Sequence, residues 1–91
     1  MTHFLWNSGK NEWLKEYRKI SFEEVVYAVE VGQLLAIVDH PKPEKYPRQK
    51  ILLVGIDSYV YMVPFVKTGN SYFLKTIIPS RKYTKEFLRG G

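Results

Sequence analysis

The sequence lacks the residues on which several kinds of catalytic and metal site depend. It contains no cysteine, which excludes disulfide bonds, thiol nucleophiles and zinc–thiolate sites, and nothing in it indicates an oxidising compartment. The two histidines, His3 and His40, stand in unrelated segments, so no His-x-x-x-His spacing predicts a metal pair. We interpret the adjacency of Asp39 and His40 as a coincidence and not as a catalytic pair. The 6 glycines are scattered and do not form a phosphate-binding loop. We therefore expect neither a metal nor a cofactor.

Long apolar runs are missing as well. No stretch approaches the roughly 20 apolar residues that cross a bilayer, and residues 1–6 lack the charged, apolar and small-residue succession of a signal peptide. We expect a cytoplasmic protein that does not enter a membrane. The chain has 91 residues, 45% of them hydrophobic and 25% charged, which predicts one soluble globular domain over residues 1–91.

Acidic residues are in the minority. The chain carries 14 Lys and Arg against 9 Asp and Glu, which gives a formal charge of +5. A basic excess on so small a body favours an anionic partner, which can be RNA, DNA or an acidic protein. A solvated basic surface without a partner explains the same charge.

What the chain has in quantity is β-forming residues between positions 48 and 78. β-branched and aromatic residues dominate three runs, separated by the turn chemistry of Asp57-Ser58 and Thr68-Gly69-Asn70. Because these connections are short, the three strands should pair as an antiparallel meander. The three predicted strands are Arg48–Ile56, Tyr59–Lys67 and Ser71–Ile78.

Two further strands are predicted upstream of the meander. Gln33–Asp39 precedes an exposed loop that holds three prolines between positions 41 and 47, and Phe4–Trp6 can add an N-terminal edge strand. Pro64, inside the second run of the meander, indicates an edge position or a bulge, because proline lacks the donor that a central strand uses.

The clearest helix signal is the capping box Ser21-Phe22-Glu23-Glu24, which begins a helix that should end near Gly32. A C-terminal helix is predicted over residues 79–88, with Ser80 as its cap. Together with the strands, these helices predict an α+β fold. It has an antiparallel four-stranded sheet, two N-terminal helices and a C-terminal helix.

The first of the N-terminal helices is predicted over Gly9–Tyr17, with Asn7 or Ser8 as its N-cap. Trp13 lies four residues before Tyr17, so the two rings share one side of this helix. We expect that side to cover the core.

Basic side chains alternate with tyrosines around the meander. Arg48 and Lys50 leave the same face of the first strand, and Lys75 interrupts an apolar face of the third, so that face must reach solvent near it. Arginine and lysine neutralise phosphate and can stabilise a phosphorane-like transition state, and tyrosines can stack on unpaired bases. The pattern predicts RNA binding and cleavage. Its further members are Tyr59, Tyr61, Arg81 and Lys82.

The same cations have a second interpretation. Charged side chains on edge strands prevent sheets of different molecules from pairing, and Arg48, Lys50 and Lys75 can serve that purpose alone.

Four motifs, in order along almost the whole chain, resemble those of BrnT-family toxins. The first two are Phe4-Leu5-Trp6-Asn7 with Lys10-Asn11, and Ile20-Ser21-Phe22-Glu23-Glu24-Val25. The third, Arg48–Gly55, is similar to the family's arginine, apolar strand and glycine. The fourth, Ile77-Ile78-Pro79-Ser80-Arg81-Lys82-Tyr83-Thr84, is similar to the family's Ile-Ile-Ser-Ala-Arg-x-Ala-Thr close.

The resemblance implies a RelE-like fold and a cytoplasmic ribonuclease toxin of a type II toxin–antitoxin system, which cuts RNA and arrests growth. It also implies a cognate antitoxin with a ribbon-helix-helix part, and operator DNA that is bound only through the complex of the two. On matching positions, Arg48 and Arg81 become the active-site candidates, and the charge argument adds Lys50 and Tyr83. The RNA-binding candidates are Lys75, Lys82, Tyr61 and Arg18.

The chain departs from the family pattern at two places. Asn7 follows Trp6 where the family has aspartate, and Tyr17-Arg18-Lys19 stands where the family has Lys-His-Gly. Arg18 can hold phosphate, but it stays charged and is a poor proton shuttle. The alternative function is therefore a non-catalytic module with a degenerate toxin fold, which binds nucleic acid or an antitoxin through the same basic face.

Overall fold

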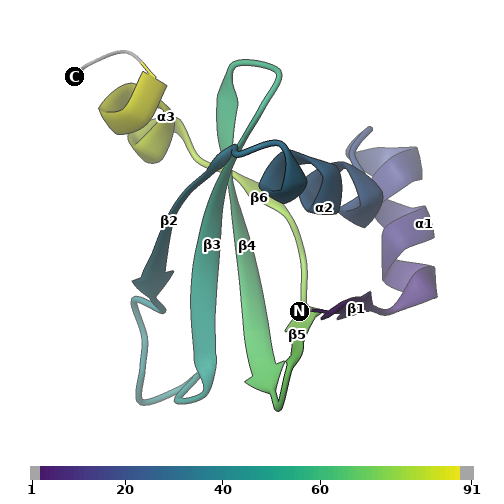
Figure 1. Ribbon diagram of the computed structural model, residues 1–91, viewed down its shortest axis with the longest axis vertical. Coiled ribbons are helices and arrows are strands. Elements are labelled where there is room, and N and C mark those ends of the chain that lie inside the picture. The colour runs from purple at the N-terminus through teal and green to yellow at the C-terminus, as the bar shows by residue number, and fades with distance from the viewer. Residues whose placement is uncertain (1–2, 89–91) are drawn as a thin grey trace.

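Residues 3–88 form three helices and one open, mixed β-sheet in the computed structural model of the chain (Figure 1). The strands are β1 (His3–Trp6), β2 (Leu34–Asp39), β3 (Gln49–Ile56), β4 (Tyr59–Thr68), β5 (Ser71–Leu74) and β6 (Ile78–Pro79). The helices are α1 (Ser8–Tyr17), α2 (Phe22–Glu30) and α3 (Arg81–Leu88). The predicted α+β class and the three helices are confirmed. None of the helices in this part of the chain is long and apolar enough to cross a membrane.

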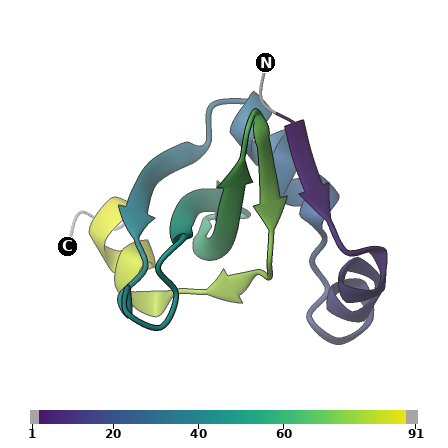
Figure 2. The ribbon, with the colours of Figure 1, turned by 90° about the horizontal axis from the view of Figure 1, so that it is seen from below.

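The strand order is β1-β5-β4-β3-β2, and β6 lies beside β4. The meander β3-β4-β5 pairs antiparallel, as its short turns predict, and β2 adds antiparallel to β3. β1 instead pairs parallel with β5, with Phe4 opposite Tyr72 and Trp6 opposite Leu74. The sheet is therefore larger than the predicted antiparallel four-stranded sheet, and it is mixed. The prediction rested on short turns, and short turns determine only the pairing of strands that follow each other in sequence. Figure 2 shows β1 at the outer edge of the curved sheet.

The last predicted strand, Ser71–Ile78, is divided. β5 ends at Leu74, residues 75–77 leave the ladder, and β6 then pairs with β4. Pro64 lies opposite this gap in the central strand β4, neither at an edge nor at a bulge as the sequence suggested. Its carbonyl accepts the N–H of Lys75 at 2.8 Å. Because the N–H and C=O of one strand residue point to the same side, the nitrogen of Pro64 faces the gap, where no ladder bond needs a donor.

β3 is buried on both faces of the sheet, because its residues Ile51 to Val54 are all covered. Its even-numbered residues Leu52 and Val54 belong to one apolar cluster with Phe22 and Val25 of α2. We call this side the α1/α2 face. A strand covered on both sides reads as a continuous apolar run, as it does here.

The odd-numbered residues of the same run build a second cluster on the opposite side. Ile51 and Leu53 pack with Val60 of β4, and Tyr83 of α3 packs against them. We call this side the α3 face. In Figure 1, α1 and α2 lie to one side of the strands and α3 to the other.

One buried side chain joins the two N-terminal helices. Asn11 of α1 is only 3% exposed. Its Nδ2 donates to Oε1 of Glu23 at 2.8 Å, and its Oδ1 accepts the backbone N–H of Phe22 at 2.8 Å. The first turn of α2 is further held by the predicted capping box, in which Ser21 and Glu24 bond reciprocally. Asn11 therefore fixes α1 against the start of α2.

The two hydrogen bonds of Asn11 also explain why the side of α1 predicted to cover the core is the wrong one. Trp13 and Tyr17, expected to cover the core, are 40% and 64% exposed. The buried side of α1 is formed by Asn11 and Leu14 instead. The polar Asn11 turns inward because α2 offers it two partners, and the helix is rotated so that both aromatic rings lie outside.

Replacing Asn11→Ala should destabilise the fold by about 2 kcal/mol, because the buried N–H of Phe22 loses its acceptor. Urea unfolding at pH 7 measures this difference. Asn7→Ala is the control, since it removes an exposed cap bond to the Lys10 N–H and should cost about 1 kcal/mol. Equal losses in the two variants would show that Asn11 is not the joint between the helices.

The same contact gives a pH dependence. The Asn11 amide, followed by the backbone N–H of Glu23 itself, holds the pKa of the Glu23 carboxyl below its ordinary value of 4.5. The folded state therefore keeps this carboxylate charged to lower pH than the unfolded state. Its contribution is full above pH 4.5 and disappears as the pH falls through the lower, folded value.

The stability difference between wild type and Glu23→Gln should thus narrow on acidification from pH 7 to pH about 3. Urea unfolding at several pH values checks this. Glu16→Gln is the control, because Glu16 accepts no side-chain hydrogen bond within residues 3–88. A stability difference between wild type and Glu23→Gln that does not change with pH would contradict a lowered pKa of Glu23 in the folded state.

Candidate functional site

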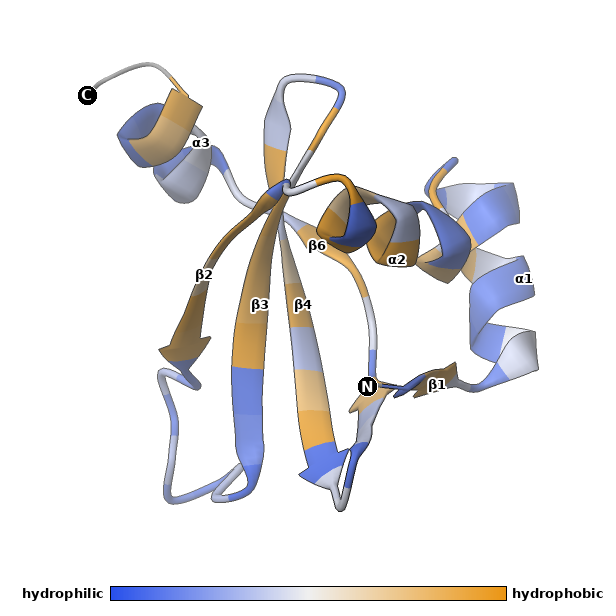
Figure 3. Cartoon of the chain, viewed as in Figure 1, coloured by the Kyte–Doolittle hydropathy of each residue, from blue (hydrophilic) through white to orange (hydrophobic). Residues whose placement is uncertain are grey.

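The clearest concentration of charge lies where β3 begins and β4 ends. We call this region the basic end of the sheet. Its cations are Lys42, Lys45, Arg48, Lys50, Lys67 and Lys75. Figure 3 shows β3 changing from hydrophobic in its middle to hydrophilic at this end. Neither α1/α2 nor α3 covers the sheet here, so polar side chains reach solvent on both faces.

The basic end carries a hollow on each face, because successive side chains of a strand point in opposite directions. Gln49 and Lys50 lie opposite Val66 and Phe65 of β4. Gln49 lines a hollow of about 440 Å³ on the α3 face, and Lys50 lines one of about 680 Å³ on the α1/α2 face. We name them the His40 hollow and the Tyr72 hollow after one residue in each.

The His40 hollow combines an imidazole, two ammonium groups and an aromatic ring. His40, Lys42 and Tyr46 come from the loop between β2 and β3, and Lys75 comes from the segment after β5. The proline-rich sequence folds this loop back, with the N–H of Tyr46 bonded to the carbonyl of Lys42 at 2.9 Å. Neither lysine forms an ion pair among the described residues, so both are available to an anion.

His40 is held in a defined position. Its ring centroid lies 4.4 Å from that of Tyr46, and its Nδ1 accepts the backbone N–H of Lys42 at 3.1 Å. Because Nδ1 serves as the acceptor, the neutral ring carries its proton on Nε2. The atom left to a ligand is therefore a hydrogen-bond donor.

The Tyr72 hollow is lined by three cations, Arg48, Lys50 and Lys67, together with Ile37, Phe65 and Tyr72. Lys50 also contacts Oδ1 of Asp39 at 3.5 Å, but both side chains are largely exposed. Such an exposed pair contributes little and can be exchanged for a stronger anion.

The structure separates the residues that the sequence analysis had grouped. Arg48 and Lys50 line the Tyr72 hollow, and Lys75 lines the His40 hollow on the other face. Arg81 begins α3 next to Ser80, whose N–H bonds to the carbonyl of Val60. From there to the basic end, β4 extends by about 20 Å. Arg48 and Arg81 therefore do not converge on one phosphate.

The remaining predicted residues lie outside the hollows. Tyr83 packs on the α3-face cluster and Lys82 lies over its ring. Arg18 ends α1, with its guanidinium 5.3 Å from the Trp13 ring centroid. Tyr61 packs against the α1/α2-face cluster, where burial, reinforced by Asp57, Glu24 and Tyr59, raises the pKa of its hydroxyl.

Sequence reasoning missed His40, Tyr46, Lys67 and Tyr72 as residues of the two hollows. The usable signal for His40 was its place, directly after a strand and before a loop rich in proline. Its partner Tyr46 lies six positions on, and only the folded loop brings the two rings together.

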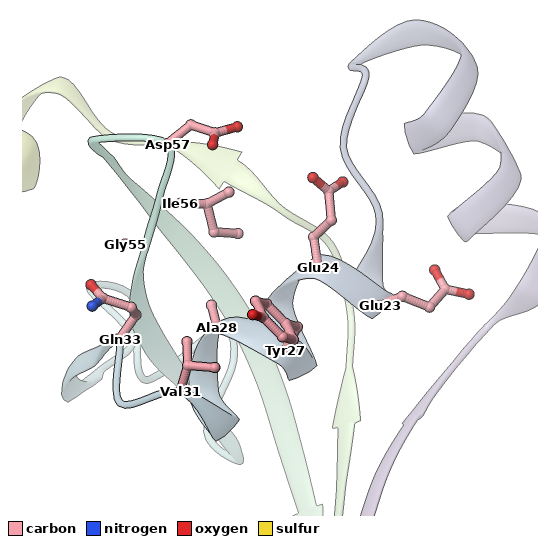
Figure 4. A pocket seen from close by; sticks show the side chains of 9 residues that line it. All are labelled: Glu23, Glu24, Tyr27, Ala28, Val31, Gln33, Gly55, Ile56 and Asp57. Atoms are coloured by element: carbon pink, nitrogen blue, oxygen red, sulfur yellow. The ribbon is translucent and has the colours of Figure 1, made fainter.

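A third hollow has the opposite charge. It lies between α2 and the β3–β4 turn, has a volume of about 390 Å³, and contains no Lys or Arg among its lining residues. Figure 4 shows the carboxylates of Glu24 and Asp57 on either side of Ile56. We call it the acidic groove. A polyanion such as RNA is repelled from it.

No cluster of His, Cys, Asp and Glu that could hold a metal ion is present among residues 3–88. Comparisons with protein families, with characterised proteins and with solved structures find no match to this chain. Its function is therefore inferred from the chemistry of its own residues. At the basic end, that chemistry is a group of exposed cations beside aromatic rings, which favours an anionic ligand.

The position of α3 on the sheet depends on Thr84. Thr84 is only 2% exposed. Its Oγ1 accepts the N–H of Val60 at 2.8 Å, and the same hydroxyl donates to the carbonyl of Ser80. Thr84→Val keeps the shape but leaves the Val60 N–H unpaired, which should cost about 1–3 kcal/mol. Urea unfolding and hydrogen exchange of the Val60 amide measure the effect. Thr84→Ser keeps the hydroxyl and should keep the Val60 amide protected. If this amide exchanged equally fast in Thr84→Val and Thr84→Ser, the hydroxyl would not have the proposed role.

Proposed function

We propose that the protein is a ribonuclease toxin of a type II toxin–antitoxin system, and that it cleaves RNA in the His40 hollow. The observation that carries this proposal is the convergence of His40, Lys42 and Lys75 in one hollow at the basic end. The order of the four BrnT-like motifs supports it. So does the net charge of +5, which favours RNA over a neutral ligand.

The chemistry proposed is attack of a ribose 2′-oxygen on the adjacent phosphorus. The new 2′-O–P bond forms as the P–O5′ bond breaks, which gives a 2′,3′-cyclic phosphate and a 5′-hydroxyl. The proton of the 2′-hydroxyl passes to water, and the departing 5′-oxygen takes one from water. Neither transfer is assigned to His40, because its Nδ1 already accepts a backbone N–H.

The protein's part is to stabilise the extra charge on phosphorus. The Nε2–H of His40 and the ammonium groups of Lys42 and Lys75 are donors of the kind that bind phosphoryl oxygens. Removing one preorganised donor to a developing oxyanion costs about 100- to 1,000-fold in rate in acyl-transfer enzymes, and we expect an effect of the same order here. Arg81 and Lys82 lie on the same side of the sheet, so RNA that continues along the α3 face can reach them.

The partner proposed is a cognate antitoxin of the ribbon-helix-helix type, which inhibits the toxin in the cytoplasm. Its toxin-binding part should be acidic, because it must cover the cations of the basic end. Operator DNA then binds to the antitoxin half of the complex. On these grounds the free protein should bind RNA and not the operator.

The second candidate is a non-catalytic RNA-binding module with the same fold. It is favoured by the engagement of His40 Nδ1 with the loop backbone, which leaves this imidazole without a free nitrogen to accept a proton. Such a module binds RNA at the basic end and leaves it uncut.

Cleavage of a labelled oligoribonucleotide tests the two candidates. His40→Ala should lower the rate of cleavage about 100-fold, because it removes the Nε2–H donor. His40→Gln should retain much of the rate, since its amide N–H can take the place of Nε2–H. His3→Ala is the matched control and should cut as fast as wild type, because His3 lies on the edge strand β1 and does not line the His40 hollow. Induced expression should arrest growth in the same order.

Three outcomes would change the assignment. RNA that binds to the wild type but stays intact would establish the non-catalytic module. Equal losses in His40→Gln and His40→Ala would show that the imidazole transfers a proton. A loss in Arg81→Ala as large as that in His40→Ala, with His40→Gln unaffected, would move the site to α3.

A further inference from the structure

The Tyr72 hollow contains an aromatic ring whose position is fixed by its neighbours. The ring of Tyr72 stacks on that of Phe65 with centroids 4.5 Å apart and an interplanar angle of 12°. Phe65 is itself only 3% exposed, and Phe4 approaches Tyr72 edge-on at 5.8 Å. An aromatic side chain held in this way loses little further freedom when a flat ligand packs against it.

Three cations surround this ring. Arg48 immediately precedes β3, Lys50 is the second residue of β3, and Lys67 lies near the end of β4. Lys67 lies directly opposite Tyr72 in the β4–β5 ladder. The combination of an aromatic platform with flanking cations is the one by which proteins bind unpaired nucleotides, through stacking of the base and neutralisation of the phosphates.

The Tyr72 hollow and the His40 hollow lie back to back. They are lined by adjacent residues of β3, Lys50 on the α1/α2 face and Gln49 on the α3 face. A ligand that leaves one hollow around the end of the sheet meets the other after crossing the loop before β3, which carries Lys45 and Arg48. The charged side chains of this loop are basic except for Glu44.

We propose that the Tyr72 hollow is a nucleotide-binding subsite, which takes an unpaired base and its phosphates from a single-stranded RNA that passes around the basic end. The subsite rests on the proposed function only for the identity of the nucleic acid as RNA. Tyr72 packs against the base, and Arg48, Lys50 and Lys67 contact the phosphates on either side of it. Asp39 releases Lys50 when the phosphate binds.

The test is the affinity for a fluorescein-labelled octauridylate with 2′-O-methyl riboses, which cannot be cleaved. Fluorescence anisotropy gives the Kd at several salt concentrations. Tyr72→Leu should weaken binding about 5- to 100-fold, because it removes the stacking surface. Lys67→Gln should weaken binding and reduce the slope of log Kd against log salt by about 0.7, since one phosphate contact is lost.

Two controls match these variants. Tyr27→Leu removes an exposed tyrosine of α2, and Lys85→Gln removes an exposed lysine of α3. Both should bind the octauridylate as the wild type does. Because Lys67 is exposed and outside the apolar clusters, Lys67→Gln tests the subsite even if Tyr72→Leu proves unstable.

Wild-type affinity in both Tyr72→Leu and Lys67→Gln would overturn the proposal. So would a loss in Tyr27→Leu equal to that in Tyr72→Leu. If an octaglutamate peptide displaces the RNA and Tyr72→Leu has no effect on either ligand, the hollow is a site for an acidic protein instead. Intact natural RNA together with a Tyr72-dependent Kd would refute the ribonuclease and leave the subsite standing.

Discussion

The fold depends on the double burial of β3. Its apolar run from Ile51 to Val54 must be covered on both sides, and α1 with α2 supply one cover while α3 supplies the other. The run stops at Lys50, because the residues before it are charged or polar, and both covers stop with it. The sheet is thus left bare at one end on both faces. The two hollows of the basic end are a direct consequence of where this single apolar run begins.

The residues of the first two BrnT-like motifs hold the N-terminal half together. Trp6 stacks on Phe22 with centroids 5.6 Å apart, Asn11 bonds to the first turn of α2, and Ser21 with Glu24 caps it. Each of these contacts is structural. Tyr17, Arg18 and Lys19, where the chain departs from the family pattern, take part in none of these contacts. Tyr17 is the last residue of α1 and Arg18 is its C-cap, and neither lines the two hollows.

Most elements could be predicted because they are encoded locally. A capping box specifies α2, and two-residue turn chemistry specifies the β3–β4 hairpin. The parallel pairing of β1 could not be predicted, since its partner β5 lies more than 60 positions further on and nothing near β1 specifies it. The rotation of α1 also escaped prediction. It follows from the two hydrogen bonds of Asn11, whose partners belong to another helix.

The candidate site was predictable in composition but not in arrangement. Alternation along a strand correctly placed Arg48 and Lys50 on the same side, and the apolar surroundings of Lys75 correctly indicated solvent beside it. The hollow that each of these cations lines, and the other residues of that hollow, depend on the register of β4 and on the fold of the loop from His40 to Tyr46. A residue pattern cannot show that His40 and Lys75 meet, because they are brought together across the sheet and not along it.

For the proposed RNA ligand, the distribution of charge around these hollows also sets the direction in which a strand can run. The α1/α2 face has cations at the basic end, and Glu24 and Asp57 at the opposite end, in the acidic groove. A strand that entered the Tyr72 hollow and continued along this face would approach carboxylates that repel its phosphates. A strand that turns around the end of β3 meets Arg48, Lys45 and Lys42, with Glu44 as the one acidic side chain among them, before it reaches Lys75. On the proposed function, the acidic groove therefore favours the route between the two hollows by repulsion, without being a binding site itself.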